Sequence, residues 1–226
     1  MYTFHTLHWG EKYNNEYPLR LYNNIKKYCK SDFLFHIITD QKQHDDIFLY
    51  KNIKISSLDK YSPIKSDRMF TYQKTVIQYK HNTGNNIILD LDFRFIKNCD
   101  DFLKNHFQIN NVPTYNLSDN YVDQIKYWGF GSCCLVNSSI VLWKDKNATF
   151  IYEHIQKHLN QILYMYDSTD MYLNYVHFPK NRILLQNIAC TYNYYLTKNC
   201  FGVCFPTSHT KYTGKKMIEL HETELF

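Results

Sequence analysis

The stretch NNIILDLDFRFIKNCDDF, residues 85–102, ends an apolar run with two aspartates, Asp90 and Asp92, before apolar residues resume. A buried strand would ordinarily continue with Val or Leu here, so the acids either belong to a site or begin a turn. A D-x-D triplet is expected about once by chance in a chain of this composition, so alone it predicts nothing. Its meaning depends on its place in the fold.

Strand and helix patterns alternate before these acids. Short runs rich in β-branched and aromatic residues predict strands. Tyr17, Leu21 and Ile25 recur at helical spacing, and Pro18 suits the first turn of that helix. The expected elements are strands at 2–7, 33–39, 52–58 and 85–92 and helices at 17–28 and 66–84. This order predicts an α/β fold whose central, mostly parallel sheet has helices on both faces.

In such a sheet, Asp90 and Asp92 lie at the carboxyl end of a central strand, where open α/β sheets bind ligands. If the segment stays extended, both carboxylates point to one side while Leu91 faces the core. Hard oxygen ligands there suit Mg²⁺ or Mn²⁺ shared with phosphate oxygens. Two alternatives stay open: a solvated turn, and a phosphatase in which the first aspartate is the nucleophile. The late position of the motif and Phe93 after it count against the phosphatase.

The composition sets the class of protein. The chain has 226 residues, 44% of them hydrophobic, and a net charge of +5 spread along its length. Seven irregularly spaced cysteines predict reduced, structural thiols. No signal-peptide pattern or transmembrane run occurs, so we expect a cytoplasmic protein, in the host cytoplasm if the source is viral. A nucleic-acid-binding module is the alternative for a basic, tyrosine-rich chain, but many tyrosines fall on apolar stripes, so no nucleic-acid partner is expected.

Five segments, taken in order, resemble the metal-dependent GT-A glycosyltransferases, particularly the small viral and bacterial nucleotide-sugar transferases. They are YTFHTLHWGEKYNNEYPLRLYNNIKKY, FHIITD, FTYQKTVIQY, IILDLDFRFIKNCDDF and VNSSIVLW. The resemblance implies one GT-A domain over 1–226, with a nucleotide-binding half at 1–98 and an acceptor half with a C-terminal lid at 99–226. It also implies a nucleotide-sugar donor, most often a UDP-sugar, a hydroxyl acceptor on a glycan or glycoconjugate, and Mn²⁺ or Mg²⁺ at Asp90 and Asp92.

The resemblance also implies residues that bind the donor. The segment from Thr6 to Trp9 matches the stretch that meets the nucleotide, Asp40 matches a position that reaches the base, and Lys74 is the basic residue before the D-x-D. The full set of expected donor contacts is Thr6, Leu7, His8, Trp9, Asp40, Arg68, Lys74, Leu91, Gly214 and Lys215. Packing of Trp9 over the sheet, a loop cap at Asp40 and a surface lysine at position 74 are the structural alternatives.

The residues expected to act on the acceptor lie in the second half of the chain. The pattern at 150–166 predicts one amphipathic helix. In DSTDMYLNYV, Asp170 matches the acidic half of a family pair, so it could be the base for the acceptor hydroxyl or could bind the sugar. Asp167 is its rival, and Asp123 is the further candidate for the base. Asp170 could also cap a helix that begins at Met171. The resemblance leaves inversion or retention of the sugar open.

The tail resembles the family only loosely. His209 is the expected third metal ligand, followed by Gly214 and Lys215 at the diphosphate, although Lys211 also falls near the histidine position. A zinc set is the weaker alternative, since its cysteine and histidine spacing is poor. That set comprises Cys200, Cys204, His209 and His221.

Overall fold

A computed structural model describes residues 1–11, 13–41, 50–61, 72–117, 136–166, 168–176, 183–185, 188–189 and 201–204. The helices are α1 (Glu16–Tyr28), the 3₁₀ helix η2 (Leu58–Tyr61), α2 (Gln73–Lys80), α3 (Asp100–Ile109), α5 (Thr149–Lys157), α6 (Leu159–Met165) and α7 (Thr169–Val176). The strands are β1 (Tyr2–His8), β2 (Phe33–Thr39), β3 (Ile53–Ser57), β4 (Asn85–Leu89), β5 (Phe93–Phe95), β6 (Thr114–Leu117), β7 (Val136–Lys144), β8 (Ile183–Leu185), β9 (Ile188–Ala189) and β10 (Gly202–Cys204).

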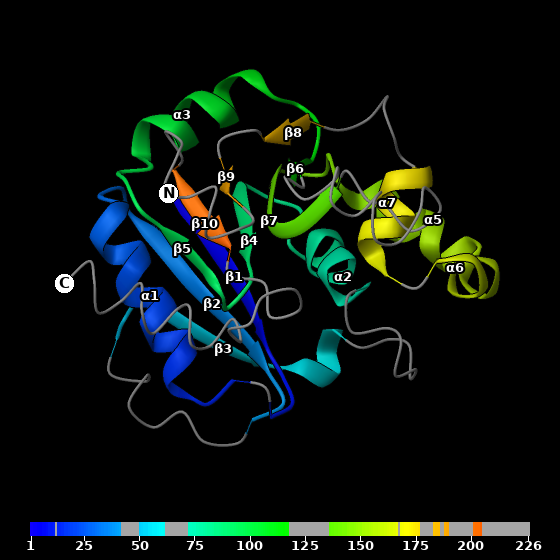
Figure 1. Cartoon of the computed structure of the whole chain (residues 1–226), viewed down its shortest axis with the longest axis horizontal. Helices are drawn as coiled ribbons and strands as arrows, with labels where there is room; N and C mark the ends of the chain where they lie inside the picture. The colour runs from blue at the N-terminus through cyan, green and yellow to red at the C-terminus, as the bar shows by residue number, and fades with distance from the viewer. Residues whose placement is uncertain are drawn as a thin grey trace.

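The central sheet has the strand order β3-β2-β1-β4-β7-β6-β8 (Figure 1). Neighbouring strands run parallel except at β7, which is antiparallel to both β4 and β6. The expected α/β fold with a mostly parallel sheet is therefore confirmed. The consecutive order from β3 to β1 reverses at β4, so the carboxyl ends of β1 and β4 meet where open sheets form a ligand crevice.

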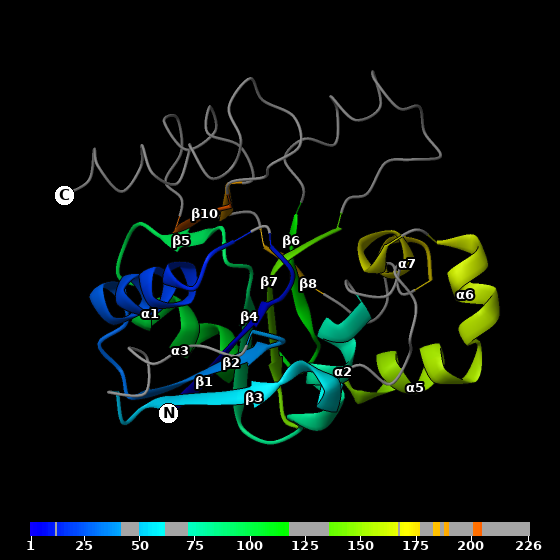
Figure 2. The same cartoon turned by 90° about the horizontal axis from the view of Figure 1, so that it is seen from below.

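Helices cover both faces of this sheet, with α1 and α3 on one face and α2, α5, α6 and α7 on the other (Figures 1 and 2). The strands bury both faces, as their nearly continuous apolar sequences require. In β4, for example, Ile87 and Leu89 pack beneath α1 and α3, while Ile88 packs on the side of α2. Among the described helices, none has the length and apolar character needed to cross a membrane.

The expected elements differ from the structure in three places. The strand expected at 85–92 ends at Leu89, so the two aspartates follow the strand. The helix expected at 150–166 is two helices, α5 and α6, which meet at His158. The helix expected at 66–84 is described as α2 from Gln73, and the capping positions proposed for it, Ser66 and Asp67, lie outside the described residues.

A second, small sheet joins the region after the acids to the far end of the chain. β5 pairs antiparallel with β10, and β10 pairs parallel with β9. Gly202 in β10 packs directly on the buried ring of Phe93, because a Cβ added at this glycine would lie 2.4 Å from Phe93 Cζ. This close approach holds residues more than a hundred positions apart beside the acidic segment.

We predict that Gly202→Ala lowers the free energy of unfolding by about 1–3 kcal/mol, the usual effect of overpacking a filled core. Urea unfolding followed by circular dichroism measures the loss. Phe93→Leu removes the ring atoms in the way, so the double variant should lose less than the two single variants together. Additive losses would contradict this contact as the cause.

Candidate active site

Asp90 and Asp92 lie in a tight turn at the carboxyl edge of the central sheet. The Phe93 amide donates to the Asp90 carbonyl over 3.0 Å, which closes the turn, here called the acidic turn (residues 90–93). The acids are therefore not presented from an extended strand, and that part of the sequence interpretation is wrong. They also do not form a simple solvated turn, because Asp92 is only 8% exposed and Leu91 packs in the core.

Both neighbouring strands hold the acidic turn in place. Thr6 Oγ1 in β1 donates to the Leu89 carbonyl over 2.9 Å. The Asp90 amide donates to the Ser139 carbonyl in β7 over 2.9 Å, and the Ser139 amide donates to Asn137 Oδ1 over 2.9 Å. The position of the two acids is thus fixed by the backbone of the sheet.

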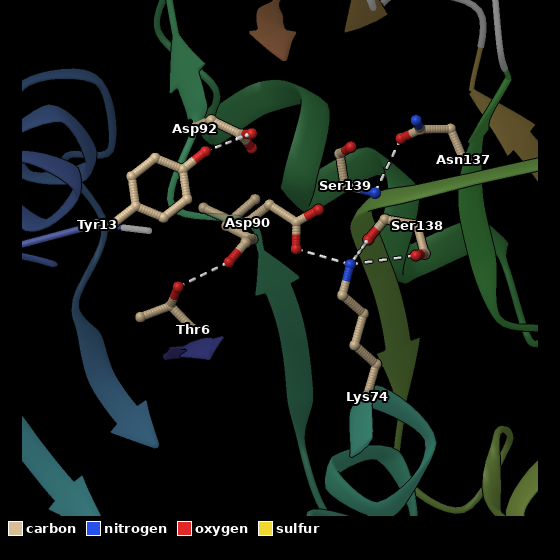
Figure 3. A network of polar contacts seen from close by, with 9 residues as sticks. Thr6, Tyr13, Lys74, Asp90, Asp92, Asn137, Ser138 and Ser139 are labelled. Carbon is tan, nitrogen blue, oxygen red and sulfur yellow. Dashed lines mark hydrogen bonds and ion pairs between the residues drawn. The ribbon is translucent and has the colours of Figure 1, made fainter. Parts of the chain in front are cut away.

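The two carboxylates face different partners, with Asp90 directed to Lys74 and Asp92 to Tyr13 (Figure 3). Lys74 Nζ lies 2.6 Å from Asp90 Oδ1. The same ammonium donates to the carbonyl of Ser138 over 2.8 Å and to its Oγ over 3.1 Å. The expected basic residue therefore points into the site from α2, and its side chain is not a surface lysine.

Lys74 is a buried cation among acids. Burial alone would lower the pKa of Lys74, but the charges of Asp90 and Asp170 outweigh it and raise that pKa above the ordinary lysine value. Lys74 is therefore charged at neutral pH. A fixed positive charge beside the acidic turn balances the carboxylates and can stabilise a phosphate group bound there.

Asp170 reaches the same network from α7. Burial raises the pKa of its carboxyl, while the charge of Lys74 and hydrogen bonding from Ser138 oppose that shift. The helix begins at Thr169, and its cap is Ser168, whose Oγ accepts from the Met171 amide over 3.2 Å. Capping is therefore the role of Ser168, and Asp170 is left to interact with the lysine.

Asp92 is oriented by a residue of the loop after β1. Tyr13 donates its hydroxyl to Asp92 Oδ2 over 2.9 Å. His8 Nε2 lies 3.0 Å from the Tyr13 carbonyl, and burial lowers the pKa of this histidine, so a neutral imidazole tethers the loop. Sequence reasoning did not place Tyr13 in the site, since an aromatic residue in a loop carries no distinguishing pattern. In the sequence, Ser138 was indicated only by its place in the segment VNSSIVLW of the resemblance.

On the expectation that Asp92 binds Mn²⁺ and the ion binds UDP, we predict that Tyr13→Phe weakens Mn²⁺-dependent UDP binding about 10–100-fold, the usual cost of losing a group that orients a metal ligand. Calorimetric titration of UDP in the presence of Mn²⁺ measures the change. Tyr22→Phe is the matched control, because its hydroxyl bonds to an amide oxygen, Asn52 Oδ1, at 2.8 Å. Equal affinities of wild type and Tyr13→Phe would contradict the role of this hydroxyl.

The expected nucleotide segment is mostly buried. The side chains of Thr6, Leu7 and His8 pack inside the protein, so any donor contact from them would come from the backbone. Trp9 is 40% exposed at the end of β1, and its side chain remains accessible to a ligand.

Asp40 closes the ends of β1 and β2 together. Its Oδ2 accepts from the Gly10 amide over 3.2 Å, and its Oδ1 accepts from Gln41 Nε2 over 2.8 Å. Gly10 has a φ of +64°, which favours glycine at this bend. Asp40 therefore has the structural role of a loop closure.

The structure thus brings Lys74, Asp90, Asp92 and Asp170 together at one edge of the sheet. Several of the other expected site residues lie outside the described residues. They are Arg68, His209, Gly214 and Lys215, together with the rivals Asp123, Asp167 and Lys211 and most of the alternative zinc set.

No protein-family model and no curated protein matches the sequence. The fold, however, matches solved glycosyltransferases. The galactosyltransferase LgtC in complex with donor and acceptor sugar analogues superimposes with a TM-score of 0.64, at 9% identity over 98% of this chain and 95% of that chain. Mouse xyloside xylosyltransferase 1 gives 0.58, at 12% identity over 90% and 96%.

A glycosyltransferase involved in the glycosylation of the major capsid of PBCV-1 gives a TM-score of 0.57, at 12% identity over 98% of both chains. Identities this low establish a shared fold and nothing finer. The expected GT-A fold is confirmed by these likenesses, and the match covers nearly the full length of all three solved chains.

Proposed function

We propose that this chain is a glycosyltransferase that moves a sugar from a nucleotide diphosphate donor, most readily a UDP-sugar, to a hydroxyl group of a glycan or glycoconjugate. The observation that carries the proposal is the acidic turn at the carboxyl edge of the sheet, where Asp90 pairs with the buried Lys74. The fold shared with glycosyltransferases supports it.

A divalent cation, Mn²⁺ or Mg²⁺, fits the oxygen donors of the acidic turn. Such ions bind through one or two carboxylates plus phosphate oxygens and keep several waters. Asp90 is one-third exposed, and Asp92 is held by the Tyr13 hydroxyl, as metal-binding carboxylates commonly are held by a neighbour. When bound, the ion would neutralise charge on the departing nucleoside diphosphate. We include His209 in the proposal as the third ligand.

Residues of different charge have different proposed roles toward the donor. Lys74 adds a fixed positive charge beside Asp90 and, through Ser138, ties α2 to β7. This preorganised charge favours the transition state, in which the donor phosphate gains negative charge as the sugar departs. Trp9 and the backbone from Thr6 onward are the proposed nucleotide contacts, with Asp40 bracing the same edge.

Asp170 is the proposed base for the acceptor hydroxyl. Burial raises the pKa of its carboxyl, which makes it a better proton acceptor than an exposed aspartate, while Lys74 favours its charged form. Binding of the donor sugar is the alternative role for the same carboxylate.

The phosphatase alternative is not favoured by this geometry. Such an enzyme needs the first acid as a nucleophile on the first strand of its sheet. Here Asp90 follows β4 and its carboxylate pairs with Lys74.

The decisive experiment compares binding and turnover in one preparation. UDP is titrated calorimetrically with Mn²⁺ and with a chelator, and a panel of UDP-sugars is then tested for release of UDP. We expect UDP to bind only with the cation and one sugar nucleotide to be consumed. Cation-independent UDP binding, or phosphate release with no sugar transfer, would overturn the proposal.

A further inference from the structure

Three histidines gather where the end of α2 packs on the central sheet. His5 in β1 and His36 in β2 are partners in the parallel register, and His81 follows the last residue of α2. One ring nitrogen from each lies within 4.8 Å of the others. His5 and His36 are fully buried, while His81 is partly exposed. We call this group the histidine cluster. His5 is opposite Ile88 of β4 in the parallel register, two residues before Asp90, and no member of the cluster belongs to the acidic turn.

Hydrogen bonds fix the orientation of the His5 ring. The Asn86 amide nitrogen donates to the carbonyls of Thr83 and Gly84, over 2.9 and 3.1 Å, so the Asn86 oxygen is the atom that faces His5. That oxygen lies 3.1 Å from His5 Nε2 and only accepts, so Nε2 carries the hydrogen. In a neutral ring, the lone pair of His5 is therefore on Nδ1, which points into the cluster.

The His36 ring has a similar arrangement, with one nitrogen at a hydrogen-bonding side chain and the other facing His5. His36 Nε2 lies 2.8 Å from Ser56 Oγ, and its Nδ1 lies 3.1 Å from His5 Nδ1. The Ser56 hydroxyl can donate to Nε2 or accept from it. When it accepts, the lone pair of the neutral His36 ring is on Nδ1, and two nitrogen lone pairs face each other across that gap. Two facing lone pairs repel unless a proton or a metal cation lies between them, and bound metals are typically held by rings whose other nitrogen donates to such a neighbour. His81, whose Nε2 lies 2.9 Å from the Tyr61 hydroxyl, supplies a third imidazole.

The ligand atoms select the kind of ion. A neutral imidazole is the form that binds metals. Three imidazole nitrogens favour zinc or copper over Mg²⁺ or Ca²⁺, which prefer oxygen ligands. The cations that act on the cluster, Lys54 and Lys80, are exposed to solvent.

We propose that His5, His36 and His81 bind a borderline transition-metal ion, with Zn²⁺ as the best fit, and that the ion joins β1, β2 and the end of α2. Zn²⁺ takes imidazole nitrogens at about 2.0–2.1 Å in tetrahedral geometry, which sets ligand nitrogens roughly 3.3 Å apart. The 3.1 Å between the Nδ1 atoms of His5 and His36 is near that value. A water completes the fourth position, and the partly exposed His81 is the side from which the ion enters.

The test uses the full chain after treatment with a chelator. Zn²⁺ is titrated by calorimetry, and Co²⁺ serves as a coloured substitute whose visible absorption reports tetrahedral nitrogen ligands. We expect one equivalent of tightly held Zn²⁺ and a rise in the unfolding midpoint, since an ion that binds the native state stabilises it. His36→Gln and His81→Gln should each weaken binding by more than the roughly 10–100-fold that loss of an outer partner causes.

Matched variants separate this site from the others. The double variant His154→Gln, His158→Gln removes two histidine rings that lie beside each other at the end of α5 and do not belong to the histidine cluster. This double variant should leave Zn²⁺ affinity unchanged. Asp92→Asn should also leave it unchanged. If the histidine variants fail to fold, Ser56→Ala keeps all three ligands and should still weaken binding about 10–100-fold. Absence of stoichiometric binding to wild type, or equal affinity in the His36, His81 and Ser56 variants, would overturn the proposal.

Discussion

Asp90→Asn and Asp92→Asn should each reduce sugar transfer by about 10³-fold or more and remove Mn²⁺-dependent binding of UDP. Each replacement keeps the size of the side chain but takes one negative charge from the oxygen donors of the acidic turn. A bound cation contributes several kcal/mol of charge stabilisation in such reactions, and each factor of ten in rate corresponds to about 1.36 kcal/mol. Calorimetry of UDP and assay of UDP release from the donor measure the two effects.

The two variants should differ in stability. In Asp92→Asn, the new amide oxygen can still accept the hydrogen bond from Tyr13. Asp90→Asn instead takes the ion-pair partner from the buried ammonium of Lys74, which then relies on the weaker attraction of Asp170 and Asp92. We therefore expect Asp90→Asn to unfold at lower urea concentration than Asp92→Asn.

A matched control separates the site from a general effect of charge. Asp101→Asn, on the exposed first turn of α3, loses one negative charge away from the acidic turn and should keep both UDP binding and transfer. Wild-type UDP affinity in both Asp90→Asn and Asp92→Asn would refute a cation at the acidic turn.

The sheet was predictable from sequence because its strands bury both faces. Phe35, Ile37 and Ile38 in β2 are all fully buried, and such continuous apolar runs separated by amphipathic helices are typical of parallel sheets. The same pattern placed the two aspartates at a strand end. In α1, the stripe of Tyr17, Leu21 and Ile25 is buried as expected. Local periodicity was therefore sufficient to predict the strands and helices of the first half of the fold.

Contacts between distant segments were not predictable in this way. Lys74 meets Ser138 across 64 positions, because β7 inserts antiparallel beside β4. β5 and β10 are three residues long, too short to show a period, and they pair over more than a hundred positions. The turn at Asp90 was missed because the strand pattern runs on through Leu91 and Phe93, and only the backbone bond from Phe93 to Asp90 separates strand from turn.

The histidine cluster illustrates the same limit. His5 and His36 each look like a polar residue in the middle of an apolar strand, and nothing local indicates that the parallel register makes them partners. His81 joins the cluster only because the end of α2 packs on the sheet. Two polar residues at matching positions of neighbouring strands can be recognised in a sequence only when the strand order is known. Strand order is set by long-range pairing, which local patterns do not show.

Asp170→Asn should preserve Mn²⁺-dependent UDP binding and reduce transfer by about 10²–10⁴-fold, the usual value of positioned proton transfer. Burial raises the pKa of this carboxyl, and a base works only when deprotonated, so wild-type turnover should fall as pH drops through that raised pKa. The variant should lack this acidic limb. Ser168→Ala is the control: it removes the cap of α7, costs about 1 kcal/mol of stability, and should leave transfer unchanged.

The outcomes of this substitution separate the two roles open to Asp170. If it binds the donor sugar instead, affinity for the sugar nucleotide should fall while affinity for free UDP stays the same, and the pH profile should keep its shape. A change in chemistry alone, with both affinities intact, identifies the base, because under the proposed function the acidic turn still holds the diphosphate when Asp170 is neutralised. Near-normal turnover would remove Asp170 from the reaction and move the search for the base to Asp167 or Asp123.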